Sequence, residues 1–321
     1  MSVARATDLR CRLMEPEDRD AVFELWRAAG WGTPSSAAWM AWHRDRVHGP
    51  SIIAVATGED GSVRGQLVLN RSQLWVRPRI VPAARAAAAV LHPDLRGGAL
   101  TTTENPILQL YRCATAAAAA QGVEVSYAVT HPLWRKWLPR LCAVLPRFEV
   151  SGRECVEVSP GPRAAGGRDL AASALEGSPG EEYDELWLAA RDGLALDCAV
   201  ERSSVSLAAR LDGSVLVEAR GRARQLVGYA LVRHRDGLLL DVLAVDRERL
   251  AQTLALAADW VARHASIAAV RVMTDPLVDD ALQALDARPV DYAFPFICHD
   301  LSDREDNPML GADHWYLTAG D

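Results

Sequence analysis

The segment 90–101, which reads VLHPDLRGGALT, holds the residues of this chain that are best suited to bind an anion. It runs from an apolar stretch that predicts a buried strand toward a longer stretch that predicts a helix. Gly97 and Gly98 allow a phosphate to approach the backbone, and N–H groups at a helix N-terminus attract negative charge. Arg96 can add a charge-assisted hydrogen bond. The segment predicts a pyrophosphate site, with a plain connecting loop as the alternative interpretation.

A second group of residues is suited to proton transfer. His131 directly follows the predicted strand 123–130, and Tyr127 lies within that strand. An imidazole can act as an acid or as a base near neutral pH. The alternative interpretations are a histidine that caps a helix and a tyrosine that packs in the core. His43 and Glu124 are weaker candidates.

Three short segments of the first half of the chain recur in the same order in the second half. They are ELWRAA at 24–29 and ELWLAA at 185–190, VRGQL at 63–67 and LVGYA at 226–230, and VTHPL at 129–133 and MTDPL at 273–277. Each match alone is weak, but their common order predicts a tandem duplication.

The stretch 159–180 is rich in Pro, Gly, Ala and Ser and predicts a linker. It divides the chain into a domain at 1–158 and a second domain at 181–321. In each half, hydrophobic periodicity predicts two helices, an antiparallel meander, a long helix, a strand, a short helix and a final strand. We therefore expect an α/β fold of the α+β kind, with a mixed sheet, that occurs twice.

This order of elements, together with the loop HPDLRGG, resembles the GCN5-related N-acetyltransferase (GNAT) superfamily, in particular proteins with two such domains in tandem. In that family an Arg/Gln-x-x-Gly-x-Gly/Ala loop holds the pyrophosphate of coenzyme A. Arg96 matches the first position, whereas Ala99 stands at the fourth and Thr101 at the sixth. The resemblance implies acetyl-CoA or another acyl-CoA as co-substrate. The residues that it assigns to the cofactor are Val90, Leu91, His92, Arg96, Gly97, Gly98, Ala99, Leu100 and Thr101.

The resemblance also implies catalytic roles. In the family, N–H groups at the end of the strand before the loop, here those of Leu91 and His92, stabilise the oxyanion. The usual acid is a tyrosine in the helix after the next strand, but Trp134 and Trp137 occupy that helix here. His131 and Tyr127 are then the candidate catalytic residues.

The second half lacks the anion-binding pattern of the first. Its corresponding segment, 245–250, reads VDRERL, with no glycine and two acidic residues. Like charges and larger side chains would keep a phosphate away from that backbone. We expect the second half to be a degenerate copy, with the acyl-CoA site in the first half alone.

Composition excludes several classes of protein. The net charge of −7 argues against a protein that grips a phosphate backbone, so we expect no DNA partner. No run of about 20 apolar residues occurs and the N-terminal region has no apolar core, so we expect no membrane span, no secretory signal and a cytoplasmic location. The six cysteines lie more than four residues apart, which does not match zinc-ligand spacing, and we expect no metal.

The function that we expect is CoA-dependent N-acyl transfer, most simply of acetyl, to a small amine such as an amino sugar or a natural-product intermediate. A catalytically silent tandem-GNAT ligand-binding protein is one alternative, favoured by the altered loop and the missing tyrosine. An aminoacyl-tRNA-dependent transferase of GNAT-like fold is another. The net charge of −7 disfavours it, although Arg135, Lys136 and Arg140 form a local basic patch. A monomer and a homodimer fit the sequence equally.

Overall fold

The computed structural model describes residues 9–43, 47–96, 104–135, 138–160, 169–302 and 311–321. Within them the strands form a ten-stranded sheet and a four-stranded sheet. The elements of the first half are β1 (Arg10–Leu13), α1 (Arg19–Ala28), α2 (Ser36–His43), β2 (Ile52–Thr57), β3 (Val63–Val76), β4 (Arg79–Leu91), α3 (Pro106–Ala120), β5 (Val125–Val129), α4 (Leu138–Leu141) and β6 (Phe148–Val158). Single 3₁₀ turns precede α1 and α4 and follow β4.

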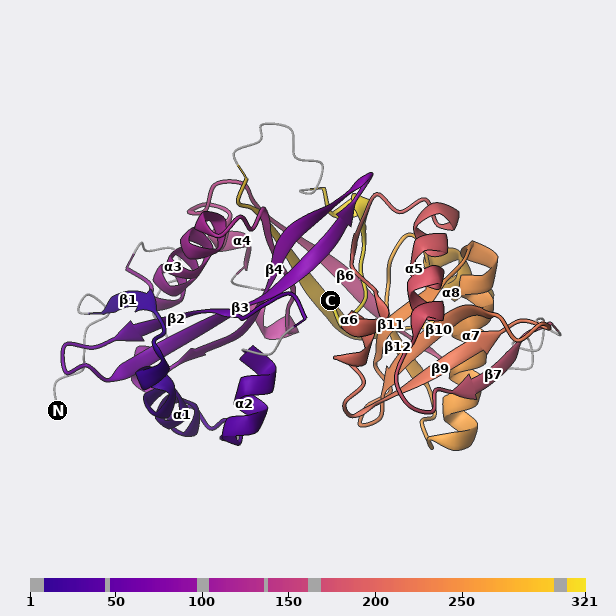
Figure 1. Ribbon diagram of the computed structural model, residues 1–321, viewed down its shortest axis with the longest axis horizontal. Helices are drawn as coiled ribbons and strands as arrows, with labels where there is room; N and C mark the ends of the chain where they lie inside the picture. The colour runs from indigo at the N-terminus through magenta and orange to yellow at the C-terminus, as the bar shows by residue number, and fades with distance from the viewer. Residues whose placement is uncertain (1–8, 44–46, 97–103, 136–137, 161–168, 303–310) are drawn as a thin grey trace.

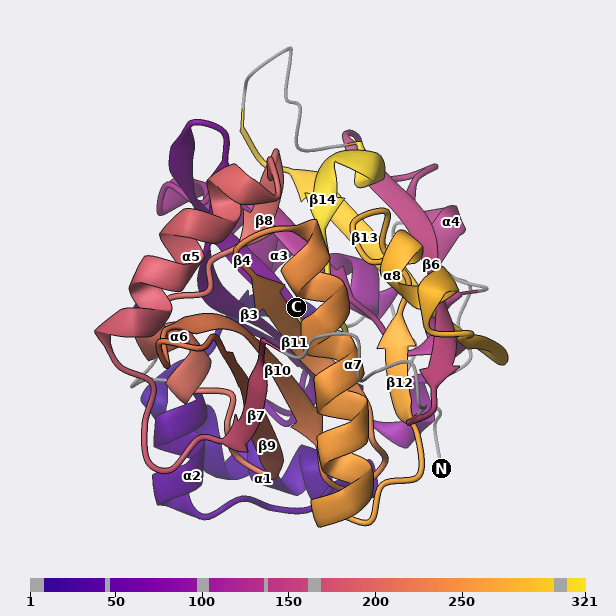
Figure 2. The ribbon, with the colours of Figure 1, turned by 90° about the vertical axis from the view of Figure 1, so that its right-hand side faces the viewer.

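The second half repeats this order with two additional short strands, β8 (Cys198–Val200) and β14 (Trp315–Tyr316). Its elements are β7 (Ala171–Ala174), α5 (Glu181–Gly193), β8 (Cys198–Val200), α6 (Ser204–Ala208), β9 (Ser214–Arg220), β10 (Leu226–Arg233), β11 (Leu239–Ala244), α7 (Arg247–His264), β12 (Val270–Met273), α8 (Asp279–Ala284), β13 (Arg288–Asp300) and β14 (Trp315–Tyr316). Figure 2 shows α5 and α7 in front of the four-stranded sheet, whose order is β11-β10-β9-β7.

Local sequence explains most of these elements. Asn105 starts α3 because its side chain accepts the N–H groups of Ile107 and Leu108 (3.0 and 3.4 Å). The turn between β2 and β3 uses Gly61 at a φ of 77°, a conformation that a residue with a Cβ rarely adopts. The predicted helices, the antiparallel meander of each half and the mixed α/β class are confirmed.

The two halves share a packing detail that fits a duplication. Gly65 of β3 lies under α3, where an added Cβ would come within 3.0 Å of Leu110. Gly228 of β10 lies under α7, where a Cβ would overlap Thr253. Glycine at the same point of each meander therefore lets the long helix approach the sheet.

The ten-stranded sheet buries apolar residues on both faces. On one face, α3 and α4 cover a core that includes Leu67, Leu108 and Phe148. On the opposite face, α1 and α2 cover a second core around Trp26 and Trp39. Beside that second core lies a third cluster, which both halves build.

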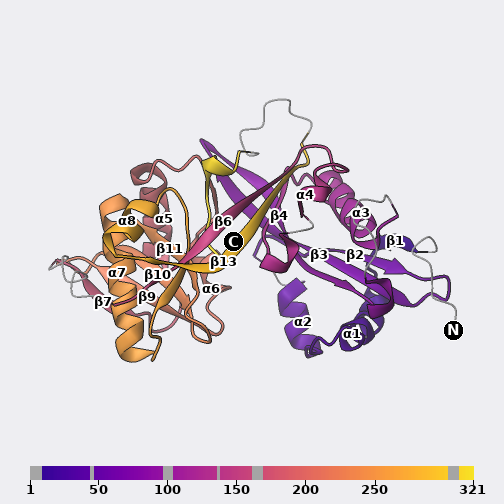
Figure 3. The same ribbon diagram turned by 180° about the vertical axis from the view of Figure 1, so that it is seen from behind.

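The long strands β6 and β13 join the two halves. Residues 296–300 of β13 pair with residues 125–129 of β5, and β13 also pairs with β6 along most of its length. In turn, β6 pairs with β12. Figures 1 and 3 show both strands crossing the middle of the molecule. The sequence predicts a final strand for each half but not this exchange.

The stretch 159–180 connects the two halves and also contributes a strand to the second one. It contains β7, which pairs with β9 at the edge of the four-stranded sheet. The prediction of a plain linker is therefore corrected for residues 171–174, while residues 161–168 lie outside the described residues. We retain the division into 1–158 and 181–321 as a proposal about the origin of the chain, since the folded halves exchange strands.

Candidate functional site

A cavity opens where β4 and β5 separate. Among the described residues these strands pair in parallel only over residues 83–85 and 125–127. Beyond that point β4 carries a bulge, where its register with β3 shifts and Ala88 has a φ of 39°. On the α3 side, the gap forms a cavity of about 410 Å³, which we call the cleft.

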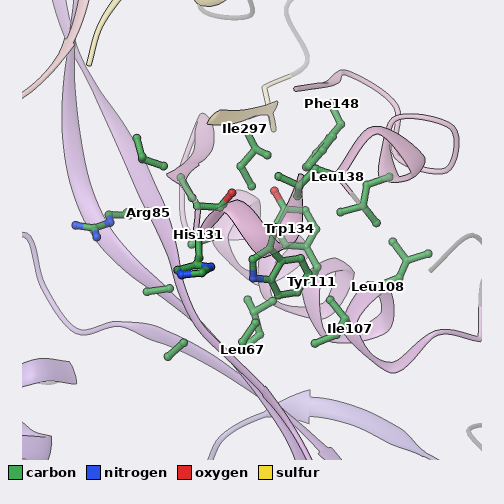
Figure 4. Close-up of a pocket in the computed structure, with 18 of the residues that line it drawn as sticks. Leu67, Arg85, Ile107, Leu108, Tyr111, His131, Trp134, Leu138, Phe148 and Ile297 are labelled. Atoms are coloured by element: carbon green, nitrogen blue, oxygen red, sulfur yellow. The ribbon is translucent and has the colours of Figure 1, made fainter. Parts of the chain in front are cut away.

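The cleft is lined almost wholly by apolar side chains (Figure 4). The bulged strand contributes four consecutive alanines, residues 86–89, whose small side chains leave the space open. Trp134 and Phe148 lie on the opposite wall, and Thr130 lies at the end of β5. Backbone edges that no longer pair with each other, in an apolar slot, suit an extended ligand with amide groups of its own.

A second cavity, of about 320 Å³, lies on the opposite face of the sheet, and we call it the polar pocket. Both halves of the chain line it, because residues from β3, β4 and β5 meet residues from α6 and the C-terminal segment. Arg85 lines the polar pocket and the cleft. Arg85 is thus common to both cavities, and it pairs with Tyr127 of the polar pocket at the last residue pair of β4 and β5 before the strands separate.

Tyr127 is a buried residue of the polar pocket, with 1% of its surface exposed. Its hydroxyl lies 3.0 Å from Oγ of Ser72. Burial, followed by the negative charge of Asp321, raises the pKa of the phenol above its ordinary value. The hydroxyl therefore stays protonated at neutral pH and can donate a proton.

The residues that end β4 are held mainly by contacts within the first half of the chain, and the cofactor-binding role predicted for them stays a prediction. Val90 points into the core under α1 and α2, away from the cleft. The N–H of His92 donates to the carbonyl of Arg64 (2.8 Å), so it is not open to an oxyanion. Leu91 pairs with Gly65 of β3 and packs against the core under α3. The predicted oxyanion role of His92 is thus corrected, because its donor extends the ladder between β3 and β4.

The loop after β4 is described only at its start. Arg96 is exposed, and its guanidinium donates to the carbonyls of Leu91 and Ala29 (both 3.3 Å). The other predicted cofactor residues of this loop lie outside the described residues; they are Gly97, Gly98, Ala99, Leu100 and Thr101. Lys136 and Trp137 lie outside them as well. The predicted pyrophosphate site therefore stays a prediction.

His131 lies at the rim of the cleft with an exposed side chain (Figure 4). Its Nδ1 accepts a hydrogen bond from the N–H of Leu133 (3.3 Å) and so caps the 3₁₀ turn Pro132–Trp134. This hydrogen bond is the one that the helix-capping interpretation predicts. A role of His131 in proton transfer stays a hypothesis.

The corresponding gap in the second half, between β11 and β12, is filled by the C-terminal segment. Residues 317–319 lie against both strands, and a space of only about 10 Å³ is left beside them. The N–H of Leu317 donates to Oδ2 of Asp275 (3.1 Å), and the N–H of Gly320 donates to the carbonyl of Leu240 (2.9 Å). A ligand could enter this gap only by displacing the segment.

Acidic side chains of the second half are occupied within the protein. Asp246 caps α7, since its Oδ1 accepts the N–H of Arg249 (2.8 Å). Asp275, which stands at the position of His131 in the repeat, is buried, and burial raises its pKa to about 6. Neither residue lines the cleft or the polar pocket. The absence of a second acyl-CoA site remains a prediction that this geometry supports.

Three residues of the polar pocket escape the sequence analysis. Arg85 carries the only charge in the run IVPAARAAAAVL at 80–91, a signal that could have singled it out. His48 and Glu201 come from different halves and lie 3.0 Å apart (Nε2 to Oε2). No local pattern connects them, because only the packing of the two halves brings them together.

Within the described ranges, no group of three or more His, Cys, Asp or Glu side chains is arranged to hold a metal ion. The helices in those ranges are too short or too polar to cross a membrane. None of the six cysteines, all of which lie in these ranges, forms a disulfide bond, and burial raises the pKa of the buried thiols Cys155, Cys198 and Cys298. Thiols held protonated in this way are suited to packing rather than to nucleophilic attack.

No protein-family model matches the sequence, and no curated protein matches it. Solved structures do match. A probable N-acyltransferase from Enterococcus faecalis V583 superimposes with a TM-score of 0.62 at 14% identity, over 92% of this chain and 72% of that one. A GCN5-related N-acetyltransferase from Kribbella flavida gives 0.61 at 17% identity, over the same shares of the two chains. Saccharomyces cerevisiae N-myristoyltransferase, solved with bound myristoyl-CoA and inhibitors, gives 0.57 at 10% identity, over 92% and 80%.

At these identities the comparisons establish the fold. The described elements superimpose over nearly the whole chain on proteins of the GCN5-related N-acetyltransferase type. The resemblance to that superfamily, inferred from the order of elements and the HPDLRGG loop, is therefore confirmed for the fold.

Proposed function

We propose that this chain, which has the fold of the GCN5-related N-acetyltransferases, is an acyl-CoA-dependent N-acyltransferase with one donor site. The observation that carries the proposal is the cleft, an open apolar slot between two strands that cease to pair. A neighbour of the same fold, the yeast N-myristoyltransferase, has been solved with myristoyl-CoA bound. We take acetyl-CoA or another acyl-CoA as the donor.

The cleft fits the pantetheine arm of such a donor. That arm is an extended chain with two amide groups, and the separated edges of β4 and β5 offer backbone N–H and C=O groups at strand spacing. Residues 86–89 leave room beside β4 because each side chain is a single methyl group. The thioester would lie near Arg85 and Tyr127, the last pair of β4 and β5 before the strands separate, because Arg85 lines both cavities.

The reaction requires few protein groups. The acceptor nitrogen attacks the thioester carbonyl, the C–N bond forms, and the C–S bond breaks with its electron pair on sulfur. Holding both substrates in contact supplies much of the rate enhancement. We assign Tyr127 the role of protonating the leaving thiolate, because its raised pKa keeps it protonated.

A bulky residue in the cleft tests the donor site. We expect wild-type protein to bind one acetyl-CoA per chain in calorimetry and Ala86→Phe to bind at least about 100-fold more weakly, a loss of about 2.7 kcal/mol. The phenyl ring would fill the slot that the alanines leave open. The matched control is Ala119→Phe, an exposed position on α3, which should bind acetyl-CoA as the wild type does.

Two outcomes would contradict this proposal. Undiminished binding by Ala86→Phe would place the donor elsewhere, and two equivalent sites per chain would mean that the gap between β11 and β12 also opens. Release of free CoA thiol in the presence of amines separates an enzyme from a silent binding protein of the same fold.

His131 offers a second test. We expect His131→Asn to keep kcat within about threefold of wild type, because an asparagine can accept the hydrogen bond from Leu133 that caps the turn. An asparagine cannot transfer a proton, and loss of an acid–base group typically lowers kcat by ~10²–10⁴-fold. Steady-state rates measured with acetyl-CoA distinguish a capping role from a role in proton transfer. A 100-fold fall in the asparagine variant would show that His131 moves a proton.

A further inference from the structure

The polar pocket contains an arginine, Arg85, that forms no ion pair with any carboxylate of the described residues. Two other arginines and two aspartates lie beside it in a closed arrangement: Arg202 binds Asp241 and Asp321 (both 2.8 Å), and Arg210 binds the same two carboxylates (2.9 and 3.0 Å). Each of the four carboxylate oxygens accepts one of these bonds. This group, which we call the four-residue ring, is therefore neutral in itself.

Arg85 lies outside the four-residue ring, and the ring does not balance its positive charge. The one hydrogen bond of Arg85 to a described residue runs from Nη1 to the carbonyl of Gly320 (2.7 Å), and no carboxylate of the described residues forms an ion pair with it. Asp321 lies close enough to favour its charge, but both carboxylate oxygens of Asp321 belong to the ring. Burial, with the nearby Arg210, lowers the pKa of Arg85 from its ordinary value. An arginine nonetheless stays charged at neutral pH.

A partly enclosed guanidinium whose N–H groups lack partners costs free energy of folding unless an anion binds to it. Guanidinium groups bind carboxylates and phosphates through paired hydrogen bonds. Arg71, from β3, also lines the pocket. Its guanidinium donates to the carbonyl of Pro50 (3.1 Å) and to Gln121, both uncharged, so its positive charge remains. The pocket therefore favours a ligand with a negative group.

The same pocket contains a histidine held by a carboxylate. Nε2 of His48 lies 3.0 Å from Oε2 of Glu201, and that oxygen also accepts the hydroxyl of Ser206 (3.1 Å). Burial opposes the charge of Glu201, but the hydrogen bonds from His48 and Ser206 outweigh it and lower the pKa of the carboxyl. Glu201 thus stays ionised and keeps the proton of His48 on Nε2. Nδ1, which has no hydrogen-bond partner among the described residues, is then the nitrogen that can accept a proton.

We propose, on the basis of the function proposed above, that the polar pocket binds the acceptor and that the acceptor is a small amine with an anionic group, carboxylate or phosphate. Arg85 binds the anion. Because Arg85 also lines the cleft, the anion lies near the thioester, so only a few atoms separate it from the amine. His48 is the general base, and Glu201 is a positioning residue.

The proton balance of this step is complete. A proton leaves the acceptor ammonium for Nδ1 of His48, and the freed electron pair forms the C–N bond. The nitrogen loses its second proton to solvent, the C–S bond breaks, and the thiolate takes a proton from Tyr127. Solvent then reprotonates Tyr127 and takes the proton from Nδ1 of His48, which restores both groups. His48 faces Glu201 and Ser206 from the second half and Arg71, Arg85 and Arg210 across the pocket. Protonation of the imidazole removes the base, so the rate should fall as the pH is lowered.

The experiment compares amines that differ only in the anion. Serine and phosphoethanolamine are each compared with ethanolamine, and glucosamine 6-phosphate with glucosamine, with acetyl-CoA as donor and thiol release as readout. We expect at least one anionic amine to exceed its neutral partner in kcat/KM by about 10- to 100-fold, the effect of one or two charge-assisted hydrogen bonds. The serine and phosphate arms tell which anion the pocket prefers. Arg85→Met should bring the ratio close to one.

The base is tested in the same assay. We expect His48→Asn to lower kcat by ~10²–10⁴-fold and to remove the acidic limb of the pH–rate profile, with acetyl-CoA affinity unchanged. Glu201→Gln should lower kcat less and shift that limb, because the imidazole remains but loses the carboxylate that orients it. His264→Asn, an exposed histidine at the end of α7, is the matched control and should behave as wild type.

Failure of this inference differs from failure of the proposed function. If the protein binds acetyl-CoA but acylates only neutral amines, or none of the anionic ones, the assignment of the polar pocket is wrong. A ratio unchanged in Arg85→Met, or a pH profile unchanged in His48→Asn, would also overturn it. If no acetyl-CoA binds and no thiol is released, the proposed function itself fails.

Discussion

Residues 1–159, produced alone, should fail to fold cooperatively. The fragment lacks β13, so β5 loses the neighbour that pairs with it from residue 125 to residue 129. Phe296 and Ile297, which are 1% and 5% exposed in the intact chain, would leave their neighbours in two cores open to water. An unpaired strand edge beside exposed apolar surface favours aggregation. We expect increased light scattering, binding of a dye specific for apolar surface and no sigmoidal urea transition.

A rescued fragment provides the control. Arg288 pairs with Glu157, so the start of β13 lies beside the end of β6. A short Gly-rich linker from residue 159 to residue 287, followed by residues 287–302, would restore β13 as a hairpin partner of β6. This version should regain a cooperative transition, whereas the same version with Ile297→Asp should not. A soluble 1–159 fragment with a cooperative transition would contradict the prediction.

The sequence predicts the elements of the fold better than their partners. Apolar periodicity locates α1, α3 and the β2–β3 hairpin, because each is specified by residues within one short segment. The exchange of β6 and β13 is different. A strand pattern shows which side chains share a face, but not which other strand, more than a hundred residues away, pairs with it. Which strand becomes the partner is decided by all the long-range contacts of the folded chain together.

The sequence predicts only part of the candidate site, because the rest of the site depends on contacts between distant segments. The strand–loop–helix order indicates where a donor would lie, and Tyr127 is a candidate because the helix after β5 lacks the tyrosine that the resemblance leads one to expect there. The pairing of His48 with Glu201, and the neutral ring that leaves Arg85 unpaired, depend on residues from both halves. The closed gap in the second half depends on where residues 317–319 pack. None of these contacts has a local signal.

The four-residue ring should contribute more stability than any exposed ion pair of the chain. Arg202 has no exposed side-chain surface, and neither do its partners Asp241 and Asp321. Burial opposes the charge of Arg202, but the two aspartates outweigh it and raise the pKa of the guanidinium. Arg202→Met would leave two buried carboxylates with only Arg210 to share, and removal of one partner from a buried ion pair costs about 3–5 kcal/mol.

The measurement is urea unfolding of Arg202→Met against Arg222→Met, whose arginine is 79% exposed in its ion pair with Asp169. The control should lose no more than about 1 kcal/mol. The double variant Arg202→Met/Asp321→Asn should recover part of the loss, because it removes one charge of each sign from the ring. Since the ring holds the segment whose Gly320 carbonyl binds Arg85, Arg202→Met should also reduce acylation of anionic amines. A loss of stability below about 1 kcal/mol would mean that water already reaches the ring and screens its charges.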